Sequence, residues 1–248
     1  MLRYARRAPS IAAFALAELV AVLAVVGTLS LILIAAWSRH CEMARRVTCR
    51  DNLRQLGVAA HIYANAHGGW LFPHTRNYGD WFTSCLSSNV YAELVALVGE
   101  RVVDCPNLYP YTIPGLVDAV GGRSQASWGI YIGYNYLGGI QSSNMNWTTG
   151  WESPVRIQDD ESLPLFADAN NMGYNEGYWV TAPHGRTGPV RVLGNRFIRL
   201  TAEVSPQGVG AEGGNVGLLG GGVEWRPVAR MQQNYWIFQH DMGNRGTW

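Results

Sequence analysis

Residues 14–37 read FALAELVAVLAVVGTLSLILIAAW, and Glu18 is the one charged side chain in this run. As a helix rising 1.5 Å per residue, the run would extend about 36 Å, enough to cross a hydrocarbon core of about 30 Å. The apolar region of a cleaved secretory signal is shorter, at about 7–15 residues. We therefore predict a membrane-spanning helix over residues 14–37.

Basic residues flank this run on both sides. Arg3, Arg6 and Arg7 precede it, which favours a cytoplasmic N-terminus. Arg39, Arg45 and Arg46 follow it, so the charge asymmetry alone leaves the orientation open.

Glu18 requires an explanation, because a carboxylate inside a membrane helix costs about 2.5–3.5 kcal/mol on insertion scales. One interpretation is that it lies near the interface and extends toward water. The other depends on cleavage of the chain between Ala13 and Phe14. The new α-amino group would then lie one helical turn from Glu18 and could pair with it, or with the same carboxylate of a neighbouring subunit.

The helix is predicted to continue beyond the membrane, to residue 66. No proline occurs between Trp37 and Asn65, and Gly68, Gly69 and Pro73 then supply a stop. Apolar residues recur with spacings typical of one buried helix face: Cys49, Leu53, Leu56, Ala60 and Tyr63. The alternative is a single-pass anchor followed by the first helix of an ordinary domain.

Residues 67–248 are predicted to form a head of short strands and long loops, because glycine and aromatic residues are abundant there. Strands are expected at 129–136, 163–167, 215–219 and 223–227, with Gly220, Gly221 and Gly222 forming a tight hairpin. A short helix is expected at 91–98, with Ala92, Val95 and Val98 on one face, and a surface loop at 140–154. The predicted fold class is α+β, with the long N-terminal helix packed on an antiparallel sheet.

The N-terminal features together resemble the signal of type IV pilins and type II secretion pseudopilins: a short basic leader, Phe14 after the cleavage position, Glu18 as the fifth mature residue, and the apolar run. The resemblance implies that a prepilin peptidase removes residues 1–13, that Phe14 is N-methylated, and that Glu18 sets subunit register during assembly. Ala13 departs from the pattern, which almost always has glycine before the cleavage position.

A second resemblance covers much of the remaining chain. Residues 49–57 read CRDNLRQLG, followed by Tyr-Ala-Asn at 63–65, Phe-Pro at 72–73, Cys-Pro at 105–106, Tyr-Ile-Gly-Tyr-Asn at 131–135 and Gly-Asn-Val at 214–216. This order is similar to prepilin-like proteins of planctomycete-type bacteria. Gly220 and Gly222 depart from it, because the family has Asp and commonly His there, and the His expected about ten residues earlier is absent. No role of that His/Asp pair is therefore carried over.

Four cysteines fit an exported domain in an oxidising compartment. They allow three pairings, of which the second resemblance favours Cys49 with Cys105, leaving Cys41 with Cys85. Cys41 and Cys49 lie about two helical turns apart, too far to bond each other. Free thiols are the alternative. Because no C-x-x-C pair occurs, no metal site is expected.

The sequence lacks the common catalytic and metal-binding signatures. The chain has no lysine and hence no Walker A loop, and it has neither G-x-S-x-G nor H-E-x-x-H. The G-x-G-x-x-G at 208–213 does not lead into a helical pattern, and the calcium-loop-like start at Asp168 has Met172 and Trp179 at ligand positions. Three histidines do not have the spacing of a zinc-binding motif and are expected to be solvated or to cap a helix: His61, His67 and His74. We predict no catalytic residue and no cofactor.

The predicted function is that of a structural subunit of a type IV pilus or a type II secretion pseudopilus. It would be held in a bacterial inner membrane with its head in the periplasm and then built into a filament, with prepilin peptidase and other pilin-like subunits as partners. The net charge of +1 argues against a nucleic-acid surface. The alternative is a membrane-tethered carbohydrate- or ligand-binding module that uses exposed aromatic residues: Trp128, Trp147, Trp151 and Trp179. A tethered enzyme is a third class, for which the chain offers no nucleophile.

Overall fold

The computed structural model describes residues 16–74, 83–109, 118–120, 123–126, 129–140, 152–174, 178–193, 205–231, 233–236 and 244–248. The expected leader at 1–13, the cleavage position at Ala13 and Phe14, and most of the expected loop at 140–154 lie outside these residues, as do Trp128, Trp147 and Trp151.

One helix, α1 (Leu16–Ala66), contains both the apolar run and the amphipathic segment, as the sequence predicts. The helix ends where glycine adopts left-handed backbone angles, with φ of +64° at Gly68 and +87° at Gly69. The amide of Gly69 donates to the carbonyl of Ala64 at 2.8 Å and so pairs one of the last helical carbonyls. Within the apolar half, Thr28 and Ser30 donate their hydroxyls to carbonyls of the preceding turn, which keeps them paired without water.

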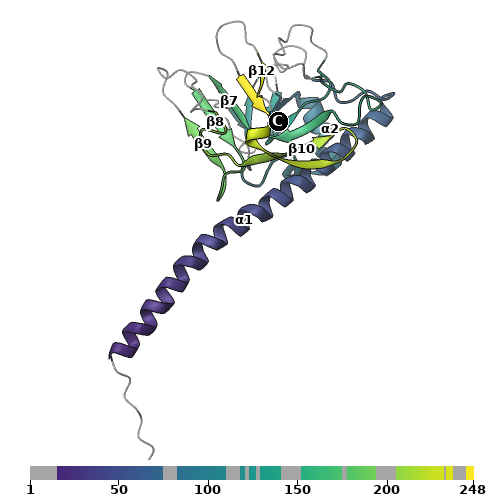
Figure 1. The fold of residues 1–248 in the computed structure, drawn as a ribbon. Coiled ribbons are helices and arrows are strands. Elements are labelled where there is room, and N and C mark those ends of the chain that lie inside the picture. Colours follow the sequence, from purple (N-terminus) through teal and green to yellow (C-terminus); the bar gives the residue numbers. More distant parts are fainter. Residues whose placement is uncertain are drawn as a thin grey trace, which may run out of the picture.

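The two halves of α1 have different surroundings. Figure 1 shows the first half projecting from the head as a rod and the second half packed along it. The described side chains between Leu16 and Ile34 are all exposed, and Trp37 is 72% exposed. In the second half the predicted face is buried: Cys49, Leu53, Leu56, Ala60 and Ala64, with Tyr63 partly buried beside them.

The described part of the head contains three antiparallel sheets, and the one packed on α1 has the strand order β11-β10-β6-β5. Its strands are β5 (Tyr134–Tyr136), β6 (Pro164–Asp168), β10 (Gly213–Leu218) and β11 (Val223–Pro227). A second sheet contains β1 (Cys85–Leu86), β2 (Asp118–Val120), β3 (Arg123–Ala126) and β4 (Gly129–Tyr131). The third contains β7 (Asn171–Tyr174), β8 (Tyr178–Ala182), β9 (Val190–Leu193), β12 (Gln233–Trp236) and β13 (Asn244–Thr247). The observed class is therefore α+β, as predicted.

The expected strand at 129–136 is two strands that belong to different sheets. β4 pairs with β1 and β3, whereas β5 pairs with β6. The change occurs at Gly133, whose amide donates to the carboxylate of Asp104 at 2.6 Å instead of continuing either ladder. A Cβ at this position would lie 2.9 Å from the Cα of Asp104, so the close approach requires glycine.

The short helix α2 (Ser88–Val98) begins earlier than expected, because the hydroxyl of Ser87 accepts from the amide of Val90. Its buried side chains are Val90 and Leu94, one turn apart. Of the three residues expected on one face, Val95 and Val98 are partly buried against the core, whereas Ala92 is exposed. The described residues also include the 3₁₀ turns η2 (Glu100–Val103) and η4 (Val228–Arg230).

The predicted glycine hairpin is present between β10 and β11. Gly217 pairs with Val223, and Gly221 has a φ of +86° at the tip. His61 of α1 lies with its Nε2 2.7 Å from the carbonyl oxygen of Leu219, which fastens the helix to this turn. The expectation of a solvated or capping role is wrong for His74, which is 5% exposed and stacks on the ring of Tyr136.

Candidate functional site

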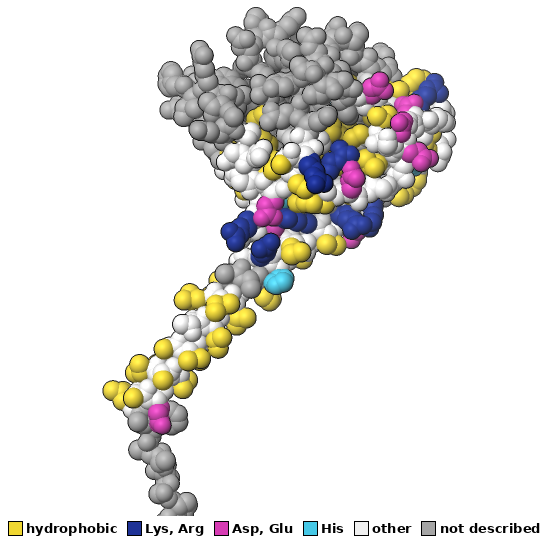
Figure 2. Space-filling model, in the orientation of Figure 1, with side chains coloured by type: hydrophobic (Ala, Val, Ile, Leu, Met, Phe, Trp, Pro, Cys, Tyr) yellow, Lys and Arg dark blue, Asp and Glu magenta, His cyan; other side chains and the backbone are white. Residues whose placement is uncertain are grey.

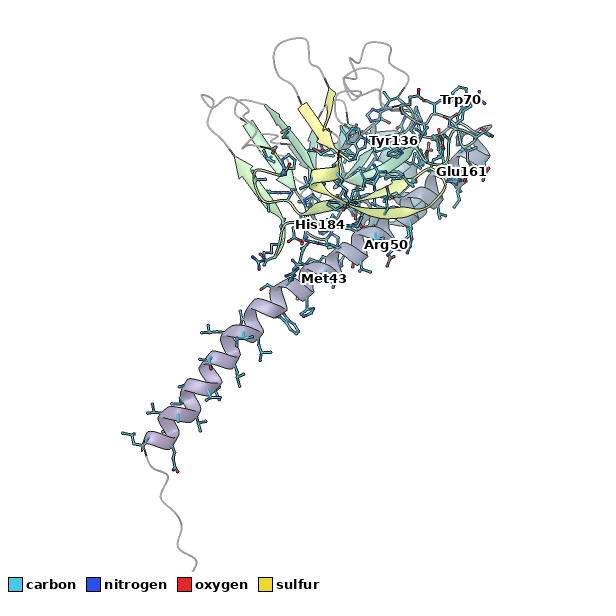
Figure 3. The ribbon with its side chains drawn as sticks, in the orientation of Figure 1. Met43, Arg50, Trp70, Tyr136, Glu161 and His184 are labelled. Atoms are coloured by element: carbon cyan, nitrogen blue, oxygen red, sulfur yellow. A yellow bond between two sulfur atoms is a disulfide. The ribbon has the colours of Figure 1, made fainter. Side chains whose placement is uncertain are left out.

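The most concentrated chemistry of the described chain lies where α1 leaves the head. Here five side chains and one disulfide come together from α1, the loop after η2, the end of β6 and the end of β8. We call this set the neck cluster: Glu42, Arg46, Asn107, Asp168, His184 and the Cys49–Cys105 disulfide. Figure 3 shows His184 beside the part of α1 that runs between Met43 and Arg50.

Glu42 is the buried carboxylate that α1 contributes. It is 1% exposed. One of its oxygens lies 2.6 Å from Nδ1 of His184 and 3.2 Å from Nε of Arg46, and the other accepts from Nδ2 of Asn107 at 2.7 Å. Burial acts to raise the pKa of Glu42, but the hydrogen bonds from His184 and Asn107 and the charge of His184 outweigh burial and lower that pKa. Glu42 is therefore an ionised carboxylate inside the protein.

His184 follows β8 and is fully buried between two carboxylates. Its Nδ1 faces Glu42, and its Nε2 lies 3.3 Å from Oδ2 of Asp168. Burial acts to lower the pKa of His184, but the charge of Asp168, its hydrogen bond and those of Glu42 outweigh burial and raise the pKa to about 9. At neutral pH the ring is thus a protonated imidazolium that neutralises one carboxylate from α1 and one from the head.

Asp168 ends β6 and faces the same ring. Its Oδ2 accepts from the backbone amide of Asn215 at 2.5 Å and from the side-chain amide of Asn215 at 2.9 Å. The same side-chain amide donates to the carbonyl of Arg46 at 3.2 Å. The other oxygen, Oδ1, is buried and has no hydrogen-bond partner among the residues that the structure describes.

Arg46 closes the outer edge of the neck cluster. Its guanidinium donates to the carbonyl of Gly185 at 2.8 Å and to Glu212 at 2.7 Å, and lies 4.5 Å from the ring centroid of Trp225. Arg46 and His184 carry positive charge against Glu42 and Asp168, so the buried part of the neck cluster is balanced. A balanced and hydrogen-bonded set satisfies the condition under which buried charges are tolerated.

The disulfide between Cys49 and Cys105 joins α1 to the loop after η2, with a sequence separation of 56. The pairing that the second resemblance implies is thus present. The remaining expected pairing, Cys41 with Cys85, is wrong, because both are free thiols. Cys41 lies at the neck, half-buried, whereas Cys85 is buried in β1, where burial raises the pKa of its thiol to about 12.

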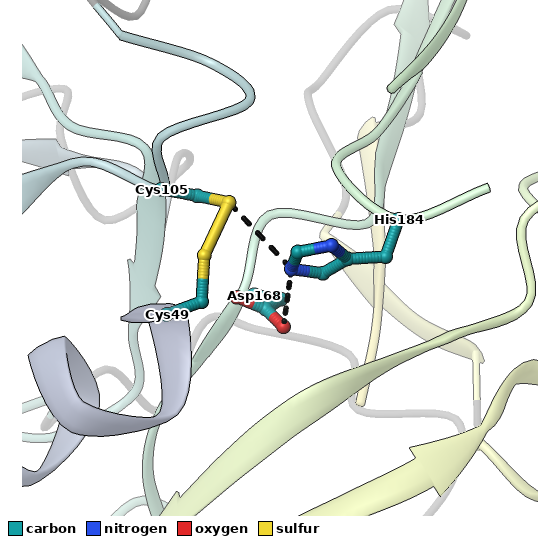
Figure 4. Close-up of side chains that lie close together, drawn as sticks. All are labelled: Cys49, Cys105, Asp168 and His184. Carbon is teal, nitrogen blue, oxygen red and sulfur yellow. Dashed lines mark hydrogen bonds and ion pairs between the residues drawn. A yellow bond between two sulfur atoms is a disulfide. The ribbon is translucent and has the colours of Figure 1, made fainter. Parts of the chain in front are cut away.

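The neck cluster also contains a potential metal-ligand set. One ligand atom from each of Cys49, Cys105, Asp168 and His184 lies within 4.8 Å of the others, and all four residues are buried (Figure 4). No spacing in the sequence pointed to this set, because its members come from four distant positions. Their closure from solvent suits a structural site better than catalysis on a substrate.

The sequence-predicted assembly residue Glu18 lies in the first turn of α1, far along the helix from the neck cluster. In the calcium-loop-like segment, Asp168 ends β6 and Asn171 begins β7, so both residues belong to strands. Trp179, one of the tryptophans of the alternative carbohydrate-binding interpretation, lies within β8.

Comparison with protein-family models gave a match over one part of the chain. Residues 41–84, which include the second half of α1, match the model of a family described as "Protein of unknown function (DUF1559)". Comparisons with curated proteins and with solved structures gave no match. By length and composition, α1 is long and apolar enough to cross a membrane, and the apolar window is covered by no other described part of the chain.

Proposed function

We propose that this protein is a pilin-like structural subunit that α1 holds in a bacterial inner membrane and then in a filament of the type IV pilus or type II secretion pseudopilus class. In this proposal a prepilin peptidase removes residues 1–13, the head lies outside the cytoplasm, and the chain performs no catalysis.

The observation that carries the proposal is the continuity of α1. A single 51-residue helix is apolar and uncovered in its first half and forms part of the head's core in its second half. An exposed apolar surface of this length requires either lipid or other protein helices around it. Figure 2 shows hydrophobic side chains over this projecting half, with an acidic side chain near its far end, and a gathering of charged side chains at the neck.

Glu18 distinguishes a filament subunit from a simple anchor. An anchor gains nothing from a carboxylate near the start of its apolar helix, whereas a subunit with a new amine at Phe14 gains a charged pair one turn away. In a filament, the apolar halves of neighbouring copies replace lipid, and the same carboxylate can neutralise the amine of the next subunit.

Mass spectrometry of the mature N-terminus tests this proposal. We expect a chain that begins at N-methylated Phe14, and an intact Met1 would contradict the proposal.

We also expect Glu18→Gln to be cleaved and membrane-inserted but to enter filaments at least tenfold less than the unaltered chain. Glu100→Gln, an exposed head carboxylate, is the matched control and should assemble normally. Normal incorporation of Glu18→Gln would exclude the assembly role.

A further inference from the structure

Two of the separations among the four potential ligands of the neck cluster match those of a tetrahedral metal site. Zinc bond lengths of about 2.3 Å to sulfur, 2.0–2.1 Å to nitrogen and 2.0–2.2 Å to oxygen give tetrahedral edges of about 3.5 Å for N···S and about 3.4 Å for N···O. Nε2 of His184 lies 3.5 Å from the sulfur of Cys105 and 3.3 Å from Oδ2 of Asp168. In the reduced chain the two sulfurs would have to separate to about 3.8 Å, the tetrahedral S···S edge, through rotation of their own side chains.

The groups around these ligands are those that support a metal-binding histidine. Metal-ligating histidines almost always donate their second ring nitrogen to a carboxylate or a carbonyl, which fixes the tautomer. Glu42 occupies this position, 2.6 Å from Nδ1 of His184. Asn215 orients Asp168 in the same way, by donating twice to Oδ2.

An independent observation also points to a ligand at this place. Oδ1 of Asp168 is buried and has no hydrogen-bond partner among the described residues, although buried polar atoms in proteins are normally paired. A cation that binds Asp168 through Oδ1, or through both carboxylate oxygens, would remove this deficit.

We propose that the reduced chain binds one Zn²⁺ ion through Cys49, Cys105, Asp168 and His184, so that a disulfide and a metal ion are alternative ways to fasten α1 to the head. Thiolate and imidazole ligands in a closed site favour zinc over magnesium or calcium. The chain carries both thiols when it is synthesised, and they form the disulfide only under oxidising conditions.

Binding requires no oxidant or reductant. Four bonds to Zn²⁺ form, two from thiolate sulfurs, one from Nε2 and one from a carboxylate oxygen. Two thiol protons and the Nε2 proton of His184 are released, so binding weakens as pH falls. Three anionic ligands on a dication leave one net negative charge at the ion, beside the positive charge of Arg46.

Cobalt binding to the full-length chain in detergent micelles tests the proposal, with Co²⁺ as a spectroscopic probe and oxygen excluded. We expect the reduced chain to bind one equivalent and to show thiolate-to-cobalt charge transfer, and the oxidised chain to show none.

Cys49→Ser should abolish the charge-transfer signal or weaken binding at least tenfold, and Glu42→Gln should weaken binding about 10–100-fold through the orientation of His184. Cys41→Ser and Cys85→Ser are the matched controls and should bind as the unaltered chain does. A reduced chain that binds no stoichiometric Co²⁺ would overturn the proposal.

Alkylation of the unaltered reduced chain provides a measurement that does not depend on the folding of any variant. Zn²⁺ should slow the modification of Cys49 and Cys105 at least tenfold, as followed by peptide mass spectrometry, and should leave Cys41 unaffected. Equal rates at Cys49 and Cys105 with and without Zn²⁺ would show that these thiols hold no metal.

Discussion

His184 is a buried positive charge whose stability depends on two carboxylates from different parts of the chain. Glu42 belongs to α1 and Asp168 to β6, so the ring joins the helix to the head by charge as well as by hydrogen bonds. The side-chain amide of Asn107 donates hydrogen bonds to Glu42 and to the carbonyl of Pro183, the residue before His184. The junction is therefore sensitive to any change that removes the charge of the ring.

The pKa of His184 leads to a prediction of pH-dependent stability. Because this pKa is raised from 6.5 to about 9 in the folded chain, the stabilisation is fully present below pH 6.5 and is lost as pH rises to about 9. At about 1.4 kcal/mol per pH unit, the free energy of unfolding should fall by about 3 kcal/mol over this interval. Urea unfolding across pH 6–10, with the disulfide intact, measures this fall in the free energy of unfolding.

His184→Gln is the control for this experiment, because it removes the titrating ring and keeps a side chain that can donate a hydrogen bond. Its free energy of unfolding should be lower at pH 6.5 and should change little between pH 6.5 and 9. Identical pH slopes for the two chains would assign the dependence to another group.

The disulfide supports a second prediction at this scale. A cross-link between two residues that are 56 positions apart restricts the unfolded chain. The loss of loop-closure entropy in the unfolded chain stabilises the folded chain by about 4 kcal/mol. The double variant Cys49→Ala/Cys105→Ala should lose about this much stability in chemical unfolding without metal. Cys41→Ser, which alters a free thiol, should change stability by less than about 0.5 kcal/mol. An equal loss in both variants would contradict the role of the cross-link.

At the scale of elements, α1 follows a different pattern on each side of the neck. Before it, apolar residues surround the whole helix, which suits lipid or a bundle of like helices. After it, one face supplies Leu53 and Leu56 to a core with Phe166 and Tyr136, and Val58 on the other face is 60% exposed. The same element thus serves as a membrane segment and as the central helix of the head.

Gly57 is a weak point in the second half of α1. A Cβ built there meets no atom within 4 Å, and the position lines a small cavity with Leu53, Leu165 and Phe166. Gly57→Ala should therefore raise the free energy of unfolding by about 1 kcal/mol, since alanine favours the helix and fills space.

Thermal or urea unfolding of Gly57→Ala measures this gain. Gly139→Ala is the matched comparison and should destabilise the fold, because Gly139 has a φ of +72° and its added Cβ would collide with the carbonyl of Phe72. A loss of stability in Gly57→Ala would show that the helix packs more tightly there than the structure indicates.

For the whole molecule, the arrangement predicts that the head does not need the apolar half of α1 in order to fold. The described residues between Leu16 and Ile34 are exposed, and the neck cluster, the disulfide and the core all begin at or after Glu42. A chain of residues 38–248 should therefore be soluble without detergent and monomeric, and should unfold within a few degrees of the full-length chain.

Sedimentation and calorimetry of the 38–248 fragment check this expectation. The full-length chain, by contrast, should partition into detergent, because its uncovered apolar half has the length of a bilayer. Aggregation of the fragment, or a large drop in its melting temperature, would show that the apolar half stabilises the head.

The fold could be predicted from the sequence wherever the signal was local. The apolar run, the buried face of α1, the glycines that end it and the β10–β11 hairpin are all patterns over neighbouring residues. The prediction was wrong where contacts between residues distant in the chain determine the structure. At Gly133 the chain passes from one sheet to another, and Asp104 accepts a hydrogen bond from the Gly133 amide. In α2, Val90 rather than Ala92 faces the core.

The sequence by itself thus determined an uncovered bilayer-length helix that continues into a head, because hydrophobic periodicity depends only on the order of residues. Only the tertiary structure brought Glu42, Asp168 and His184 together with the disulfide at the neck. These residues are distant in the chain, and no spacing rule relates them. Their ionisation states arise from burial and mutual distance, which exist only after the head has folded around α1.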